Sequence, residues 1–75
     1  MNEKILSWYS GYKAKEYPLV FSFKGTLIKT KLLKETELIE DEKTGERKMK
    51  FTVLTESGGL FHILVGEEIQ ISKVS

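Results

Sequence analysis

The fold of this chain is decided by residues 48–53, Lys48-Met49-Lys50-Phe51-Thr52-Val53, in which polar and apolar side chains alternate without interruption. A repeat of two residues is the pattern of a β-strand with one buried face. A polar loop with a glycine near its end, residues 41–46, comes before this strand and predicts a hairpin with residues 26–40.

The charges of the two strands predict how this hairpin pairs. If Leu38 lies opposite Met49, then Glu40 lies opposite Arg47, and Glu37 lies opposite Lys50. Opposite charges that face each other across a ladder stabilise it modestly and help to select one register.

The first arm of the hairpin is less regular. Its alternation runs through Ile28, Thr30 and Leu32, and the phase then breaks at Leu32-Leu33. A bulge or a sharp bend in one long strand produces such a break. The alternative is a short amphipathic helix over residues 32–39, since Lys, Leu and Glu are good helix formers. The turn and the strand that follow favour the strand.

The rest of the chain also consists of short strand signals separated by turn residues. Pro18 favours an extended Tyr17, and Leu19, Phe21 and Phe23 then alternate with polar or β-branched residues to give one aromatic face. The remaining strands are expected at residues 5–9, 60–65 and 69–74, with turns at Ser10-Gly11, Lys24-Gly25, Ser57-Gly58-Gly59 and Gly66-Glu67-Glu68.

These elements predict an all-β fold in a single small domain over residues 1–75. Five to six short antiparallel strands without a crossover helix form a small barrel or a meander. We expect an SH3-like rather than an OB-like barrel, because the OB fold usually has a helix between its strands and this chain leaves little room for one.

The sequence shows no site for catalysis, a cofactor or a metal ion. The chain has no cysteine, and His62 is its only histidine, in an apolar strand without a partner for a metal site. The acids of residues 41–46 have the wrong spacing for a calcium loop. No apolar run reaches the length of a membrane span, and the first residues do not form a signal peptide. We therefore expect a cytoplasmic protein that is not an enzyme.

Charge is unevenly distributed along the chain. Residues 1–34 carry seven lysines and two acids, whereas residues 35–46 carry six acids and one lysine. Aromatic residues lie among the early lysines, and aromatics that stack on bases beside phosphate-binding lysines hold single-stranded nucleic acid in small barrels. The candidate set is Trp8, Tyr9, Tyr12, Lys13, Lys15, Tyr17, Lys24, Lys29 and Lys31. The structural alternative places Trp8 in the core and the lysines on an ordinary solvent face.

A protein-interaction or assembly module is the function that we favour from the sequence. SH3-like barrels bind extended peptides in grooves lined by Tyr and Trp, often beside acids, and residues 37–42 supply such acids here. Self-association through exposed strand edges belongs to the same class. Single-stranded nucleic-acid binding is the alternative, and a regulatory role that the sequence does not identify is a third.

Residues 8–12 (Trp-Tyr-Ser-Gly-Tyr) and 16–25 (Glu-Tyr-Pro-Leu-Val-Phe-Ser-Phe-Lys-Gly) resemble the start of a small uncharacterised family of bacterial all-β domains. Members show an aromatic or basic residue, then Pro, Phe and a Gly turn, followed by strands and a charged hairpin. This chain has Phe23-Lys24 where the family has a tryptophan before the Gly turn. The resemblance implies a small β fold without catalytic residues, and a link of some members to DNA-repair polymerases.

Overall fold

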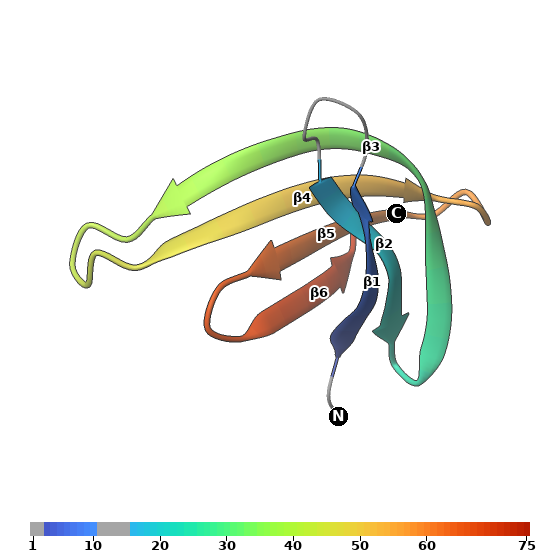
Figure 1. Ribbon diagram of the computed structural model, residues 1–75, viewed down its shortest axis with the longest axis horizontal. Helices are drawn as coiled ribbons and strands as arrows, with labels where there is room; N and C mark the ends of the chain where they lie inside the picture. Colours follow the sequence, from blue (N-terminus) through green and yellow to red (C-terminus); the bar gives the residue numbers. More distant parts are fainter. Residues whose placement is uncertain (1–2, 11–15) are drawn as a thin grey trace.

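The computed structural model describes residues 3–10 and 16–75, and these form six β-strands. The strands are β1 (Lys4–Ser10), β2 (Glu16–Phe23), β3 (Thr26–Glu40), β4 (Arg47–Thr55), β5 (Leu60–Val65) and β6 (Ile69–Lys73). Each strand pairs antiparallel with the next along the chain, and the sheet curls into a half-barrel (Figure 1). The prediction of an all-β fold of antiparallel strands is therefore confirmed.

The bent strand β3 joins the two halves of the molecule. Residues 26–29 pair with β2, and residues 30–40 pair with β4. Figure 1 shows β3 rising from the β2–β3 turn and bending over to run beside β4. Extra residues at Lys31 and Lys34 shift the β3–β4 register, as bulges do when a strand bends. The strand interpretation of residues 32–39 is thus confirmed, and the helix alternative is wrong.

The register of the β3–β4 hairpin is the predicted one. Leu38 pairs with Met49, Glu37 with Lys50, and Glu40 with Arg47. The Arg47 Nε atom lies 3.5 Å from Glu40 Oε2, and both side chains are more than half exposed. Solvent screens such a pair, so its contribution to the free energy of unfolding is small and its main effect is on register.

The core lies between the two halves of the curled sheet. Its buried residues are Phe21, Phe51, Val53, Phe61, Ile63 and Ile71. Phe61 packs edge-to-face against two rings of β2, with centroids 5.4 Å from Phe21 and 5.2 Å from Phe23. The β1–β2 hairpin therefore covers the inner face of β4 and β5 through aromatic contacts.

The predicted alternation in β2 holds at one end of the strand and is wrong at the other. Phe21 and Phe23 contact the core as expected. At Leu19 the register with β1 shifts, because Ser7 pairs with Val20 whereas Trp8 pairs with Pro18. This extra residue resets the phase, so Pro18 is fully buried and Leu19 is only half-buried.

Candidate functional site

The inner face of the half-barrel is lined by apolar side chains in rows that cross the strands. One row is formed by Leu38, Met49, Val65 and Ile69, each paired with the next across β3, β4, β5 and β6. We call these four residues the apolar row. The neighbouring row contains Phe51, Ile63 and Ile71, which belong to the core. The apolar row is therefore a continuation of the core surface toward the β3–β4 hairpin.

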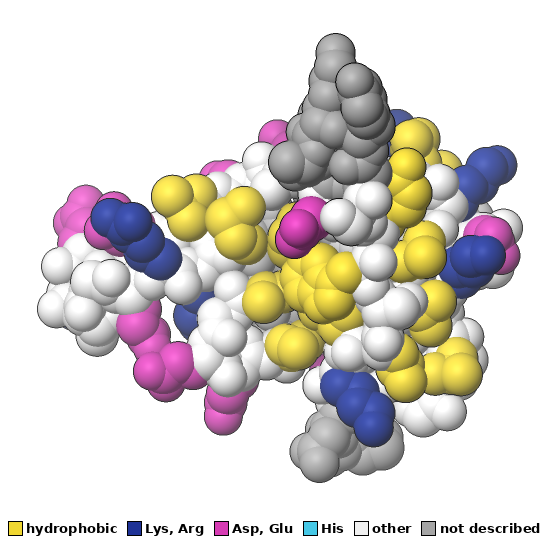
Figure 2. Space-filling view, in the orientation of Figure 1, with side chains coloured by type: hydrophobic (Ala, Val, Ile, Leu, Met, Phe, Trp, Pro, Cys, Tyr) yellow, Lys and Arg dark blue, Asp and Glu magenta, His cyan; other side chains and the backbone are white. Residues whose placement is uncertain are grey.

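The apolar row is only partly covered. Leu38 is 58% exposed, and Met49, Val65 and Ile69 are half-buried, whereas Phe51 and Ile63 one row further in are buried. Figure 2 shows hydrophobic side chains gathered on the face that carries β1 and β2, over its centre and toward the β3–β4 hairpin. The β1–β2 hairpin thus covers the row of Phe51 and Ile63 but does not fully cover the apolar row.

Trp8 stands at this boundary. Its ring packs edge-to-face on Phe51, with centroids 5.7 Å apart and planes at 74°. Its side chain nevertheless remains 42% exposed, so the expectation that Trp8 lies in the core is wrong. The physical reason is that Phe51 already fills the interior below it, which leaves Trp8 as the rim of the covered region. A half-exposed tryptophan near a partly covered apolar row is a typical anchor point of an interface.

Two tyrosines of the predicted aromatic set form the cross-strand pair that follows Trp8 and Pro18 in the β1–β2 ladder. Tyr9 and Tyr17 pair across β1 and β2, and their rings stack with centroids 4.9 Å apart at 23°. Each ring covers one face of the other, so only the outer faces are left for a stacked ligand. Tyr12, Lys13 and Lys15 lie outside the described residues.

The described lysines of the predicted set lie at different distances from these aromatics along the sheet. Lys24 is in the β2–β3 turn, at the opposite end of β2 from the residues that pair with Trp8 and Tyr9. Lys29 pairs with Val20 in the middle of β2, and Val20 pairs with Ser7 on its other side. Lys31 is at the first bulge of β3. All three lysines are exposed, as the structural alternative predicted. Among the described residues, the structure therefore separates Lys24 from the aromatics, whereas Lys29 and Lys31 flank Thr30, which donates a hydrogen bond to the Trp8 partner Pro18.

The sequence did not indicate that the apolar row was a surface feature. The alternation of β4 and the predicted pairing of Leu38 with Met49 placed both residues on the inner face of the hairpin. These two patterns could not show how much of the inner face is covered by β1 and β2.

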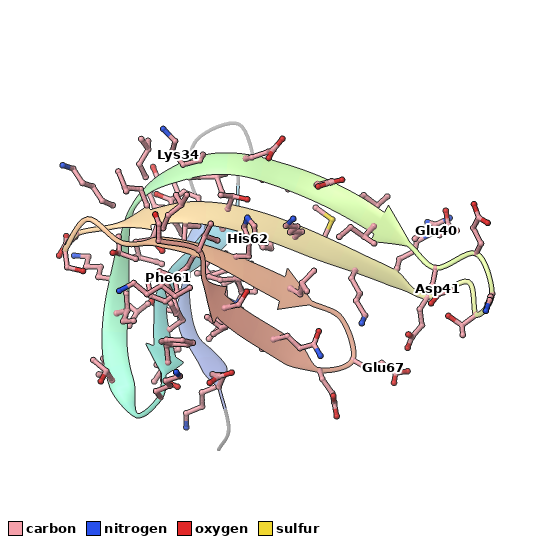
Figure 3. All side chains as sticks on the ribbon, turned by 180° about the vertical axis from the view of Figure 1, so that it is seen from behind. Lys34, Glu40, Asp41, Phe61, His62 and Glu67 are labelled. Carbon is pink, nitrogen blue, oxygen red and sulfur yellow. The ribbon has the colours of Figure 1, made fainter. Side chains whose placement is uncertain are left out.

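His62 and the acidic loop hold the positions expected of structural residues. His62 is half-buried between Thr52 and Ser72 on the opposite face of the sheet (Figure 3). The loop at residues 41–46 is exposed, and Asp41 Oδ1 accepts a 2.8 Å hydrogen bond from the Lys43 amide. Within residues 3–10 and 16–75, no group of three or more His, Cys, Asp or Glu side chains is arranged to hold a metal ion. In the same part of the chain, no helix has the length and apolar character needed to cross a membrane.

Comparison with known proteins finds no match for this chain among protein-family models, curated proteins or solved structures. The resemblance to a bacterial all-β family and the likeness to SH3-type barrels therefore stay predictions.

Proposed function

We propose that this chain is a non-enzymatic, cytoplasmic interaction module that binds an extended apolar segment of a partner protein across the apolar row and Trp8. The observation that carries the proposal is the partly uncovered row of four apolar side chains beside a half-exposed tryptophan. Contiguous exposed apolar surface of this kind marks interaction sites in small proteins. The absence of cysteine agrees with a reducing compartment.

The spacing of the row indicates the form of the ligand. Neighbouring strands are about 4.8 Å apart, so four side chains across four strands span roughly 14 Å. Side chains on one face of an extended chain recur about every 6.8 Å. An extended segment with apolar residues at alternate positions therefore places three of them along the row. Recognition of extended segments in aromatic-lined grooves is common to small β domains.

The experiment uses short synthetic peptides that carry apolar side chains at alternate positions, together with peptides of the same composition in which those residues are adjacent. Each is titrated into the ¹⁵N-labelled protein, and binding is followed by amide chemical shifts and the Trp8 indole signal. We expect the alternating peptides to bind more tightly, with the largest shifts at Met49, Val65, Ile69 and Trp8.

Two substitutions on one strand form a matched pair for this titration. Leu38 belongs to the apolar row and is 58% exposed, whereas Leu32 pairs with Leu54 on the opposite face and is 49% exposed. We expect Leu38→Lys to weaken peptide binding by about tenfold, which corresponds to about 1.4 kcal/mol, and Leu32→Lys to leave it unchanged. Equal effects of both substitutions, or shifts confined to other faces, contradict the proposal. A third outcome is that the protein binds none of the peptides but forms dimers, and that Leu38→Lys abolishes these dimers. That outcome shows that the row serves self-association instead.

A further inference from the structure

A surface hollow lies at the other end of the half-barrel from the apolar row. It has a volume of about 760 Å³ and is bounded by the β2–β3 turn, the β4–β5 turn and the end of β6. The apolar row lies at the opposite ends of these same strands, near the start of β4 and the end of β5. This volume is within the range of about 300–1,000 Å³ that is usual for small-molecule sites.

The apolar part of the lining consists of two aliphatic and two aromatic side chains, Leu27, Ile28, Phe23 and Phe61. Leu27 is 67% exposed, Ile28 is half-buried, and Phe61 is buried at the base. Phe23 packs against the Phe61 ring and lies 5.4 Å below the Lys24 Nζ atom. These contacts occupy the aromatic rings, so the accessible wall suits an aliphatic group better than a stacked base.

The side chains at its rim carry an excess of positive charge. Among the described residues, Lys24, Lys29 and Lys73 line the hollow, with Glu56 as the one acid in the lining. Lys29 Nζ lies 3.9 Å from Glu56 Oε2, and both side chains are more than half exposed. Lys24 and Lys73 are not in this pair, and both are exposed. The lining side chains thus have a net charge of two positive units.

The backbone of the β4–β5 turn is already engaged. The Gly58 amide donates to the Thr55 carbonyl oxygen at 3.0 Å, and the Gly59 amide donates to Thr55 Oγ1 at 3.0 Å. Neither glycine amide is free for a ligand, so the positive charge that would attract an anion at this site comes from the lysine ammonium groups. A lysine ammonium group acts there as a mobile point charge, unlike the planar guanidinium group of arginine, which binds anions in a fixed two-pronged geometry.

We infer that this hollow binds an aliphatic carboxylate, with its head near Lys24 and Lys73 and its chain along Leu27 and Ile28. The combination of a positive rim and an aliphatic wall matches both parts of such a molecule, and a neutral alcohol of the same length matches only one. The site is separate from the apolar row and does not rest on the proposed function.

The probe is octanoate, titrated into the ¹⁵N-labelled protein, with 1-octanol as the neutral counterpart and adenosine monophosphate as an anion with an aromatic body. We expect octanoate to shift the amides of Leu27, Ile28 and Gly59 and to bind several-fold more tightly than either comparison ligand. Raising the salt concentration weakens this binding, because exposed charges are screened. Equal affinity for octanol, or tighter binding of adenosine monophosphate, overturns the inference.

Three lysine substitutions that each remove one charge test which positions matter. We expect Lys24→Asn and Lys73→Gln each to weaken octanoate binding about threefold, within the range for exposed charge pairs. Lys31→Gln, outside the hollow, serves as the control and leaves binding unchanged. An equal loss in Lys31→Gln shows that only net charge matters. Octanoate shifts at Met49 and Ile69 instead of Leu27 place the ligand on the apolar row. Either result overturns the assignment.

Discussion

Thr30 Oγ1 donates a 2.8 Å hydrogen bond to the carbonyl oxygen of Pro18, and both residues are buried. This contact lies where β3 leaves β2, since the last β2–β3 pair is Val20 with Lys29. From that point the backbone of β3 pairs with β4, beginning at Thr30 with Thr55. The hydroxyl of Thr30 therefore supplies the partner that the diverging strand no longer offers to Pro18.

Replacement of Thr30 by valine tests this contact. Valine keeps the shape but removes the donor, and a buried carbonyl without a partner costs about 1–3 kcal/mol. We expect Thr30→Val to lower the free energy of unfolding by that amount, measured by urea denaturation. Thr52→Val is the control, because Thr52 is a half-buried strand threonine on the opposite face of β4. Equal effects of the two substitutions mean that the Thr30 hydroxyl has no special role.

The Lys24-Gly25 turn predicts a substitution that stabilises the protein. Both residues have positive φ, 50° for Lys24 and 79° for Gly25, as a two-residue hairpin turn of type I′ requires. Asparagine adopts this conformation more readily than lysine. We expect Lys24→Asn to raise the free energy of unfolding by up to about 1 kcal/mol.

Lys24→Ala separates turn geometry from charge in the same denaturation experiment. Alanine removes the charge without the preference of asparagine for positive φ, so we expect it to give no stabilisation. If both substitutions stabilise the protein equally, relief of charge repulsion is the cause and the turn argument is wrong.

The exposure of Trp8 predicts the behaviour of its fluorescence. A half-exposed indole is accessible to a neutral quencher, so acrylamide quenches it in the folded protein. We expect single-stranded oligodeoxythymidylate at low salt to leave the emission unchanged, because the Trp8 ring packs edge-to-face on Phe51 and Lys24 lies at the far end of β2 from Trp8. Quenching by the oligonucleotide that weakens steeply with salt would instead support the nucleic-acid alternative.

The hairpin of β3 and β4 shows how much the sequence alone could predict. Its register follows from the alternation around Met49 and Phe51 and from the opposite charges at Glu37 and Lys50, which are local properties of two adjacent strands. The broken phase at Leu32-Leu33 likewise indicated a bulge, and the structure has extra residues on either side, at Lys31 and Lys34.

The candidate site could be predicted from the sequence only in part. Trp8 was predicted in the set of aromatics, but its contact with Phe51 joins residues far apart in the chain. Lys73 of β6 lines the hollow of about 760 Å³ together with Lys24 of the β2–β3 turn, although the two residues are far apart in the sequence. Neither relationship leaves a periodic signal, because it depends on how the sheet curls.

The sequence by itself determined the strands, their turns and, outside the Leu19 end of β2, the faces on which apolar side chains lie, because these follow from the two-residue repeat and from turn residues. Only the tertiary structure decided which part of the inner face is covered. The bend of β3 and the shifted register at Leu19 set where the β1–β2 hairpin lies across β4 and β5. That placement buries Phe51 and Ile63 and leaves Leu38 and Trp8 exposed, although all four are large apolar residues of strands.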